Sequence, residues 1–276
     1  MWVGGYIRAL EFNLVLAPAV DRSYTFQGHG DTYVKERLPN IEVQTKSASS
    51  ALSAYNYTDT KQSISINVHQ ACAIKHEDLA QLLSRGDMKA AMTSKMGYAL
   101  GRAIDVNLGG LVASYSQTVG SLGVELTYDN LIRGVQYLED AGYDMSSGVT
   151  WFFSPASKGG IMKMDTFTHG SYVGEAAAVA AHTKATIGNF QGAPVKVSNL
   201  LNSPASGQHD NWLIHKESAA LVMAQSVKTS TERIALDLAD VVVQDQVYGY
   251  SEIDRYSETP GNITATDEGG VWLKGV

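Results

Sequence analysis

Cysteine is almost absent from this sequence, since Cys72 is the only one among 276 residues. No disulfide bond can therefore form within the chain, which is typical of proteins that fold in a reducing compartment such as the cytoplasm. Cys72 itself lies in an apolar run, and this position favours a small buried hydrophobe over a reactive thiol.

Basic clusters and long apolar runs are missing as well. The chain has 21 Lys and Arg against 28 Asp and Glu, a net charge of −7. Nucleic-acid-binding surfaces normally show clustered Lys and Arg, so the composition argues against tight binding to nucleic acid. No stretch approaches the roughly 18 apolar residues that span a bilayer, and Arg8 and Glu11 interrupt the N-terminal segment where a signal peptide needs an apolar core. We therefore expect no membrane partner.

Catalytic motifs are also missing. The chain has no G-x-S-x-G elbow, no phosphate-binding loop and no dinucleotide-binding glycine turn. Two groups of potential metal ligands remain, namely His69, Cys72 and His76, and His209, Asp210 and His215. On a strand, His69 points away from Cys72, and the second group lacks upstream ligands at helical spacing. We predict no catalytic, cofactor-binding or metal-binding residue; a cytoplasmic metal-dependent hydrolase using the His209–His215 region is the alternative.

The composition is otherwise that of a globular protein, with 44% hydrophobic and 18% charged residues. Residues 60–78, TKQSISINVHQACAIKHED, place Ile64, Ile66 and Val68 on one face of a strand, and after Gln70 the apolar alternation resumes. As one strand this run would be roughly 40 Å long, at about 3.3 Å per residue. The strand-like run 28–44 and the small polar segment 45–61 precede it. Together they predict a long hairpin, about 30–74, with a flexible tip, and an isolated hairpin must lie against its own domain or a neighbouring molecule.

Helical patterns follow the hairpin. Glu77 and Asp78 predict a helix start, and apolar residues then recur at helical spacing to Leu111, with the main segment beginning near Asp87 or Met88. A second helix is expected within 120–142, capped by Thr127 and closed by Gly142.

Shorter segments complete the pattern. Strands are expected at 147–155 and 192–202. Residues 215–227 fit a helix or a strand, and 231–253 read as a helix that becomes β-rich. Helices and strands do not alternate in the regular β-α-β order of parallel-sheet folds, so we predict the α+β class.

The order of these segments resembles the major capsid proteins of tailed bacteriophages, with the Hong Kong ninety-seven type coat fold. The resemblance is carried by GDT (30–32), QSISINVHQACAIKHEDLAQ (62–81), MGYALGRAIDVNL (96–108), LTYDNLIRGVQYLEDAGYD (126–144), VTWFFSP (149–155), HKESAALVMAQ (215–225) and ERIALDLADVVVQDQVYG (232–249). It implies an N-terminal arm (1–27), an extended hairpin loop that lies across a neighbouring subunit (28–75), a peripheral domain with a long spine helix (76–125), an axial domain with returning peripheral strands (126–253) and a C-terminal tail (254–276). Residues 170–190 and 257–276 depart from the family pattern.

The resemblance implies a structural protein, not an enzyme, that forms pentamers and hexamers of itself in an icosahedral shell around a double-stranded DNA genome. Scaffolding and portal proteins are implied partners, a decoration protein is a further one, and the packaged DNA would be held without sequence-specific binding. The location would be the virion capsid, assembled in the host cytoplasm. An encapsulin-like compartment is the alternative within the same fold.

The hairpin supplies the candidate subunit-interface residues, which are Lys35, Glu36, Arg37, Ile64, Ile66 and Val68. The first three place charges of both signs on the first hairpin strand. Either these charges lie in solvent and protect an exposed edge strand, or they contact opposite charges on an adjacent subunit. Some relatives cross-link their subunits through a lysine in the hairpin. No motif selects Lys35, Lys46 or Lys61 for this role, so we predict no cross-link.

Overall fold

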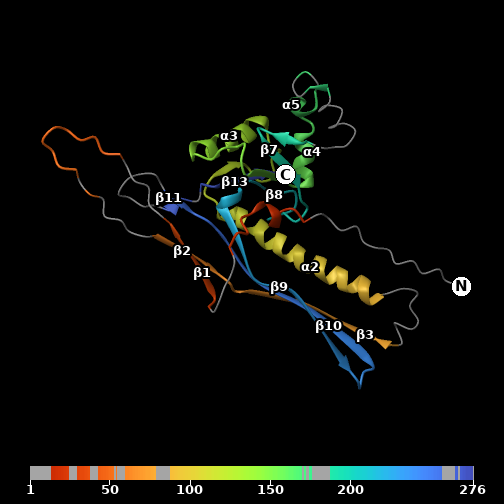
Figure 1. Cartoon of the computed structure of the whole chain (residues 1–276). Coiled ribbons are helices and arrows are strands. Elements are labelled where there is room, and N and C mark those ends of the chain that lie inside the picture. The colour runs from red at the N-terminus through yellow and green to blue at the C-terminus, as the bar shows by residue number, and fades with distance from the viewer. Residues whose placement is uncertain are drawn as a thin grey trace.

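The computed structural model describes residues 14–24, 30–37, 43–52, 54, 60–78, 88–169, 171, 174–175, 187–256, 265–266 and 268–275. It has a body built on a six-stranded sheet, a long three-stranded sheet with one long helix along it, and a two-stranded hairpin that leaves the body (Figure 1). This mixture confirms the predicted α+β class. No helix in the described ranges is long and apolar enough to cross a membrane.

The element bounds are as follows. The strands are β1 Thr32–Arg37, β2 Thr60–Ser65, β3 Val68–Glu77, β4 Thr118–Gly120, β5 Val149–Phe153, β6 Asn189–Phe190, β7 Ala193–Val197, β8 His209–His215, β9 Ala219–Ile234, β10 Ala239–Glu252, β11 Arg255–Tyr256, β12 Ala265–Thr266 and β13 Gly270–Gly275. The helices are α2 Met88–Gly110, α3 Tyr128–Asp140, α4 Pro155–Ile161 and α5 Asp165–Thr168, with 3₁₀ turns η1 Ala17–Ala19, η2 Leu111–Ser114 and η3 Lys216–Ser218.

The body forms around the sheet β4-β13-β8-β5-β7-β6. Strand β5 is buried along its whole length, as its dense apolar sequence predicted, and Trp151 and Phe153 stack in the core at 5.6 Å between ring centroids. Helix α3 covers the sheet and has the predicted ends. The Thr127 side chain accepts a hydrogen bond from the Asn130 N–H at 3.3 Å, and Gly142 closes the helix at φ +78°.

Strand β13 belongs to the segment expected as the C-terminal tail, residues 254–276. It lies inside the six-stranded sheet, parallel to β4 and antiparallel to β8. Gly270 lets the strand approach η2 closely, because a Cβ atom there would lie 2.6 Å from the Tyr115 ring. Residues 257–264 lie outside the described part of the chain, and so does most of 170–190.

The three-stranded sheet has the order β3-β10-β9 and is antiparallel throughout. Helix α2 begins at Met88 as predicted and buries Met96, Leu100, Ile104 and Leu108 at four-residue spacing. The sheet beneath it is partly polar, since the buried Gln246 side chain donates to the Leu100 carbonyl at 3.0 Å. This bond ties the helix to β10 at one position along the sheet.

One sequence expectation is wrong at the edge of this sheet, and another falls at a boundary. Strand β3 runs to Glu77 and Asp78 is helical, so the chain turns helical at the acidic pair where a helix start was expected; residues 79–87 lie outside the described part. The helix expected from residue 231 is the second half of β9, followed by a turn into β10. The ambiguous segment 215–227 is mainly strand, after the short turn η3.

The described part of the expected N-terminal arm, residues 14–24, packs against the body. Leu16 and Val20 are fully buried in one core cluster with Ile104 and Leu108 of α2. A backbone hydrogen bond from the Leu221 N–H to the Asp21 carbonyl, at 2.9 Å, joins the segment to β9. We call residues 14–21 the strap, because they connect the helix layer with β9.

Candidate subunit interface

The hairpin is shorter than the sequence indicated. Strands β1 and β2 pair with each other, from Thr32 opposite Ser65 to Arg37 opposite Thr60. The alternating run then breaks at residues 66–67, and β3 pairs with β10 instead. The single strand expected over residues 60–78 is therefore two strands in two sheets. Strand β10 lies close to the chain at this break, because a Cβ atom on Gly249 would lie 2.4 Å from the Ser65 carbonyl oxygen.

The apolar interface candidates turn out to contact their own chain. Ile64 is fully buried among Tyr24, Ala220, Val222 and Ile253, so it offers no surface to a neighbouring subunit, and this candidate is corrected. Its burial follows from the short distance between β2 and the start of β9. Ile66 and Val68 are half-buried and pack against core clusters of the same chain, and any role between subunits stays a proposal for them.

The charged candidates Lys35, Glu36 and Arg37 lie on β1, opposite Gln62, Lys61 and Thr60 in the hairpin register. Their side chains lie outside the described part of the structure. Their proposed contact with a neighbour stays a prediction.

The hairpin tip, residues 43–52, lies far from the body, at the left of Figure 1. Val43 is 93% exposed and Leu52 is 59% exposed. Lys46 is the only charged residue in this segment. The tip therefore presents apolar side chains and one positive charge to the surroundings.

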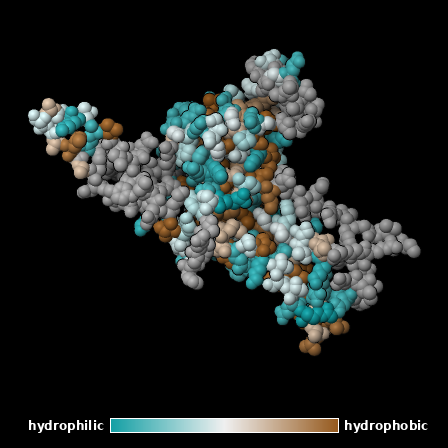
Figure 2. Space-filling model, in the orientation of Figure 1, coloured by the Kyte–Doolittle hydropathy of each residue, from teal (hydrophilic) through white to brown (hydrophobic). Residues whose placement is uncertain are grey.

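A second exposed feature lies at the opposite end of the molecule, where a turn connects β9 to β10 (Figure 1). Leu236 is 97% exposed and Leu238 is 63% exposed, and Figure 2 shows hydrophobic residues at this lower end among hydrophilic ones. Leu238 has φ +46°, a left-handed conformation that is unfavourable for a bulky side chain. Strain of this kind persists where the surrounding structure fixes it.

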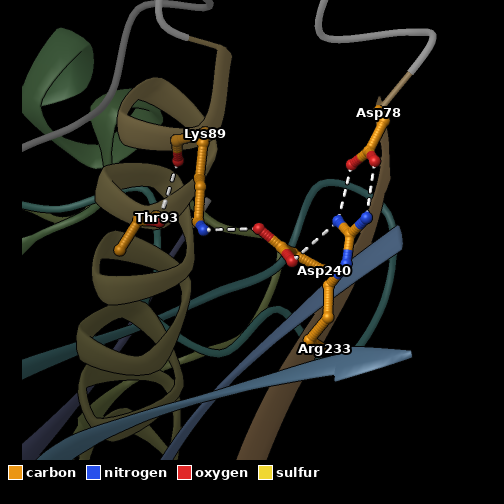
Figure 3. Close-up of polar contacts among 5 residues, drawn as sticks. All are labelled: Asp78, Lys89, Thr93, Arg233 and Asp240. Atoms are coloured by element: carbon orange, nitrogen blue, oxygen red, sulfur yellow. Dashed lines mark hydrogen bonds and ion pairs between the residues drawn. The ribbon is translucent and has the colours of Figure 1, made fainter. Parts of the chain in front are cut away.

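Ion pairs on the α2 side of the sheet hold this turn (Figure 3). Both terminal nitrogens of Arg233 donate to the Asp78 carboxylate, at 2.6 and 2.5 Å, and one also donates to Asp240 at 3.2 Å. Lys89, at the start of α2, donates to the other Asp240 oxygen at 3.0 Å. The network thus joins the ends of β3, β9 and β10 to the helix.

The network lowers the pKa of both carboxyl groups. Hydrogen bonds from Arg233 lower the pKa of Asp78, and hydrogen bonds from Lys89 and Arg233 lower that of Asp240. The same contacts raise the pKa of Arg233. Two acids face two bases, so these four charges balance.

Near the β9–β10 turn, the face of the three-stranded sheet that points away from α2 carries more acidic than basic side chains. Lys75 forms an ion pair with Asp237 at 2.5 Å. Glu77 shares this face of β3 with Lys75, and Glu232 lies in the same cross-strand row as Lys75 and Val241. Both glutamates are exposed. One base here faces three acids.

The histidine groups do not form a metal site. Among the described residues, no three His, Cys, Asp or Glu side chains are grouped so that they could hold a metal ion. His209 and His215 stand at opposite ends of β8, roughly 20 Å apart at about 3.3 Å per residue. The buried Asp210 accepts hydrogen bonds from Asn202 at 2.6 Å and from the Trp272 indole at 2.9 Å, which is a structural role.

Comparison with known proteins identifies the fold. No family model and no curated protein matches the sequence. A chain from a structure of Mycobacterium phage Che8 matches with TM-score 0.79 and 18% identity over 99% of this chain and 95% of that one. The capsid structure of the cyanophage P-SCSP1u matches with TM-score 0.77 and 13% identity over 99% and 91%. The asymmetric unit of the mature capsid of bacteriophage PhiM1 matches with TM-score 0.74 and 11% identity over 99% and 90%.

These matches cover nearly the whole length of both chains, so this chain has the fold of tailed-phage capsid chains. The fold expected from the resemblance is confirmed. It is consistent with the Hong Kong ninety-seven type.

Proposed function

We propose that this chain is a major capsid protein, which assembles with copies of itself into an icosahedral shell around a double-stranded DNA genome. The observation that carries the proposal is the agreement of the whole fold, at TM-scores of 0.77 and 0.74, with chains from two phage capsids. A partial match would leave room for an added catalytic unit, whereas this one leaves about 1% of the chain unmatched.

Features of the chain itself support the same function. The hairpin tip and the β9–β10 turn expose large apolar side chains at two ends of one molecule, and exposed apolar side chains gathered at one place mark interaction sites. The net charge of −7 would keep packaged DNA from adhering to the inner wall. The DNA would then be held without sequence-specific contacts and could leave the shell later.

The proposal extends to partners and location. The shell would consist of pentamers and hexamers, assembled in the host cytoplasm with scaffolding and portal proteins, and a decoration protein could bind its outside. The subunit would have no catalytic activity and no cofactor. Nothing in the fold favours the metal-dependent hydrolase, because His209 and His215 lie at opposite ends of β8.

The experiment is to express the full chain alone and with candidate scaffolding proteins, and to examine it by sedimentation and electron microscopy. Closed megadalton shells without protein cargo are the expected result. Shells that consistently co-purify with one cargo protein would favour an encapsulin-like compartment. A protein that stays small under every condition and loses a hydrolytic activity on His209→Ala would overturn the proposal.

A further inference from the structure

We propose that the exposed side of α2 binds an acidic amphipathic helix of a separate partner protein. The inference goes beyond the proposed function, because it assigns to the unassembled subunit a binding site for a different protein. We call the site the helix seam, and it consists of Met92, Lys95, Ala99, Arg102 and Val106.

The helix seam has the spacing of a helix-pairing surface. All five residues are exposed, and the largest apolar ones, Met92 and Val106, are 37% and 46% exposed. They follow one another at steps of three, four, three and four positions, which is the spacing of the a and d positions of a coiled coil. Apolar residues occupy the a positions 92, 99 and 106, and bases occupy the d positions 95 and 102. The seam therefore forms one row along α2, roughly 21 Å long at about 1.5 Å per residue.

The charge of the seam is positive only, although the whole chain has a net charge of −7. Asp105 is the single acid of α2, and it is buried. Lys89 is held by Asp240 (Figure 3). Lys95 and Arg102 have no hydrogen bond or ion pair from their side chains within the described parts of the chain. The seam therefore favours an occupant that brings acids to these two bases and apolar side chains to the a positions.

Other occupants match the seam less well. A second copy of α2 would bring Lys95 and Arg102 close to the same two bases in either orientation, and like charges across a contact oppose association. The hairpin tip is unsuitable for the same reason, because its only charge is the positive one of Lys46. DNA would match the charge, but its binding surfaces normally carry clustered bases and would leave the apolar a positions unused. An acidic amphipathic helix satisfies both the charge and the apolar spacing.

The rest of the fold holds the seam ready for a partner. Helix α2 lies along the three-stranded sheet (Figure 1), where the Gln246 side chain donates to the Leu100 carbonyl at 3.0 Å. On another side of the helix, Asp105 accepts hydrogen bonds from the strap, including the Val15 N–H at 2.8 Å. The seam is thus on a helix that is fixed before binding, which lowers the entropy cost of association. Ala99, at the centre of the seam, leaves room for a second helix to approach closely.

A designed peptide tests the site on the full-length, unassembled subunit. The probe is a synthetic helical peptide of three heptads, with leucine at each a position and glutamate at each d position, which matches the seam in a parallel alignment. A control peptide exchanges its d and f residues, so that the composition is the same but the acids point away. Fluorescence anisotropy at low salt should show that the parent binds the probe at least about tenfold more tightly than the control peptide.

Variants of the seam identify the residues responsible. Lys95→Glu combined with Arg102→Glu should weaken binding of the probe by at least about tenfold, and a probe with lysine at the d positions should restore binding to this double variant. Arg133→Glu is the matched control, since it makes the same charge change on the exposed side of α3 and should bind like the parent. Ala99→Trp should also weaken binding, because it fills the centre of the seam. Circular dichroism should show that all variants are folded.

Two results would overturn the inference. Equal binding of the probe and the control peptide, or no restoration by the lysine probe, would show that the seam does not pair with a helix. A short DNA duplex that displaces the probe, and whose own binding is lost in the double variant, would assign the seam to DNA instead. These measurements use the unassembled subunit, so a negative result leaves shell formation and the proposed function untouched. A parent chain that forms no shell would overturn the proposed function without changing the peptide result.

Discussion

The carboxylate of Asp105 accepts a hydrogen bond from the backbone N–H of Val15 at 2.8 Å, although the two residues are 90 positions apart in the sequence. The same carboxylate accepts from the N–H groups of Leu16 at 3.2 Å and Ala17 at 3.0 Å. Asp105 is fully buried in α2, so its charge is compensated in the structure by the first N–H groups of the strap. A buried carboxylate held in this way fixes the N-terminal segment on the helix.

The first prediction concerns this contact. Asp105→Asn should lower the free energy of unfolding by about 1–3 kcal/mol, because the amide NH₂ replaces one acceptor and leaves a buried N–H unpaired. Urea denaturation of the unassembled subunit measures it. Glu139→Gln makes the same change on an exposed residue of α3 and should stay within about 0.5 kcal/mol of the parent. Equal effects of the two variants would show that Asp105 does not hold the strap.

The second prediction concerns the point where the hairpin leaves the three-stranded sheet. A Cβ atom on Gly249 would lie 2.4 Å from the Ser65 carbonyl oxygen and 3.0 Å from the Ile66 Cα atom, and backbone cannot move aside as a side chain can. Gly249→Ala should therefore destabilise the subunit by about 1–3 kcal/mol, as overpacking does.

Gly159→Ala is the control for that variant. Gly159 lies in α4, and a Cβ atom added there would have no neighbouring atom within 4 Å, so alanine should be neutral or slightly stabilising. The unfolding temperatures of both variants, compared with that of the parent, measure the two effects. A Gly249→Ala subunit as stable as the parent would mean that β2 and β10 are not held this closely.

The third prediction is the pH dependence of the Arg233 network. The folded state lowers the pKa of Asp78 and Asp240 below the ordinary value of 3.8, through their hydrogen bonds to Arg233 and Lys89. Groups with a lowered pKa stabilise the fold above their unfolded pKa and lose that contribution as the pH falls through the folded pKa. The parent should therefore be slightly more stable than Arg233→Gln at pH 7.

That difference should shrink as the pH falls below about 4, where the carboxyl groups of the unfolded chain take up protons. Unfolding curves of both proteins between pH 3 and pH 7 measure it. The network is exposed to solvent, so the difference should also shrink at high salt. A difference that stays constant over this range would exclude these ion pairs as its source.

Several elements could be predicted from the sequence because their signals are local. The alternation in β3, the caps of α3 and the apolar run of β5 are all set by residues within one segment. The break between β2 and β3 has no such signal, since the apolar alternation continues through Ile66 and Val68. At the break the chain lies against Gly249 of β10, about 180 residues away, a proximity that only the fold creates.

The turn between β9 and β10 was missed for a related reason. Residues 231–238 have the charged and apolar mixture of a helix start, but pairing with β10 makes 231–234 the end of strand β9, and 235–238 form the turn. The polar hairpin tip was predicted, whereas the excess of acids at the end of the three-stranded sheet was not. It depends on Lys75 and Glu232 lying in the same cross-strand row, a proximity that only the fold creates.

The last prediction separates folding from assembly in the hairpin. Ile64 is buried in its own chain, so Ile64→Ala should destabilise the subunit by about 2–5 kcal/mol. Replacing residues 43–52 with a Gly-Ser-Gly linker removes mostly exposed side chains from a tip that lies far from the body, so the unassembled subunit should keep the unfolding midpoint of the parent. The same replacement should sharply reduce shell formation, because it removes the segment that reaches a neighbour. Denaturation and sedimentation of both variants give the two readouts. Normal shells from the linker variant would show that the hairpin tip is not an assembly arm.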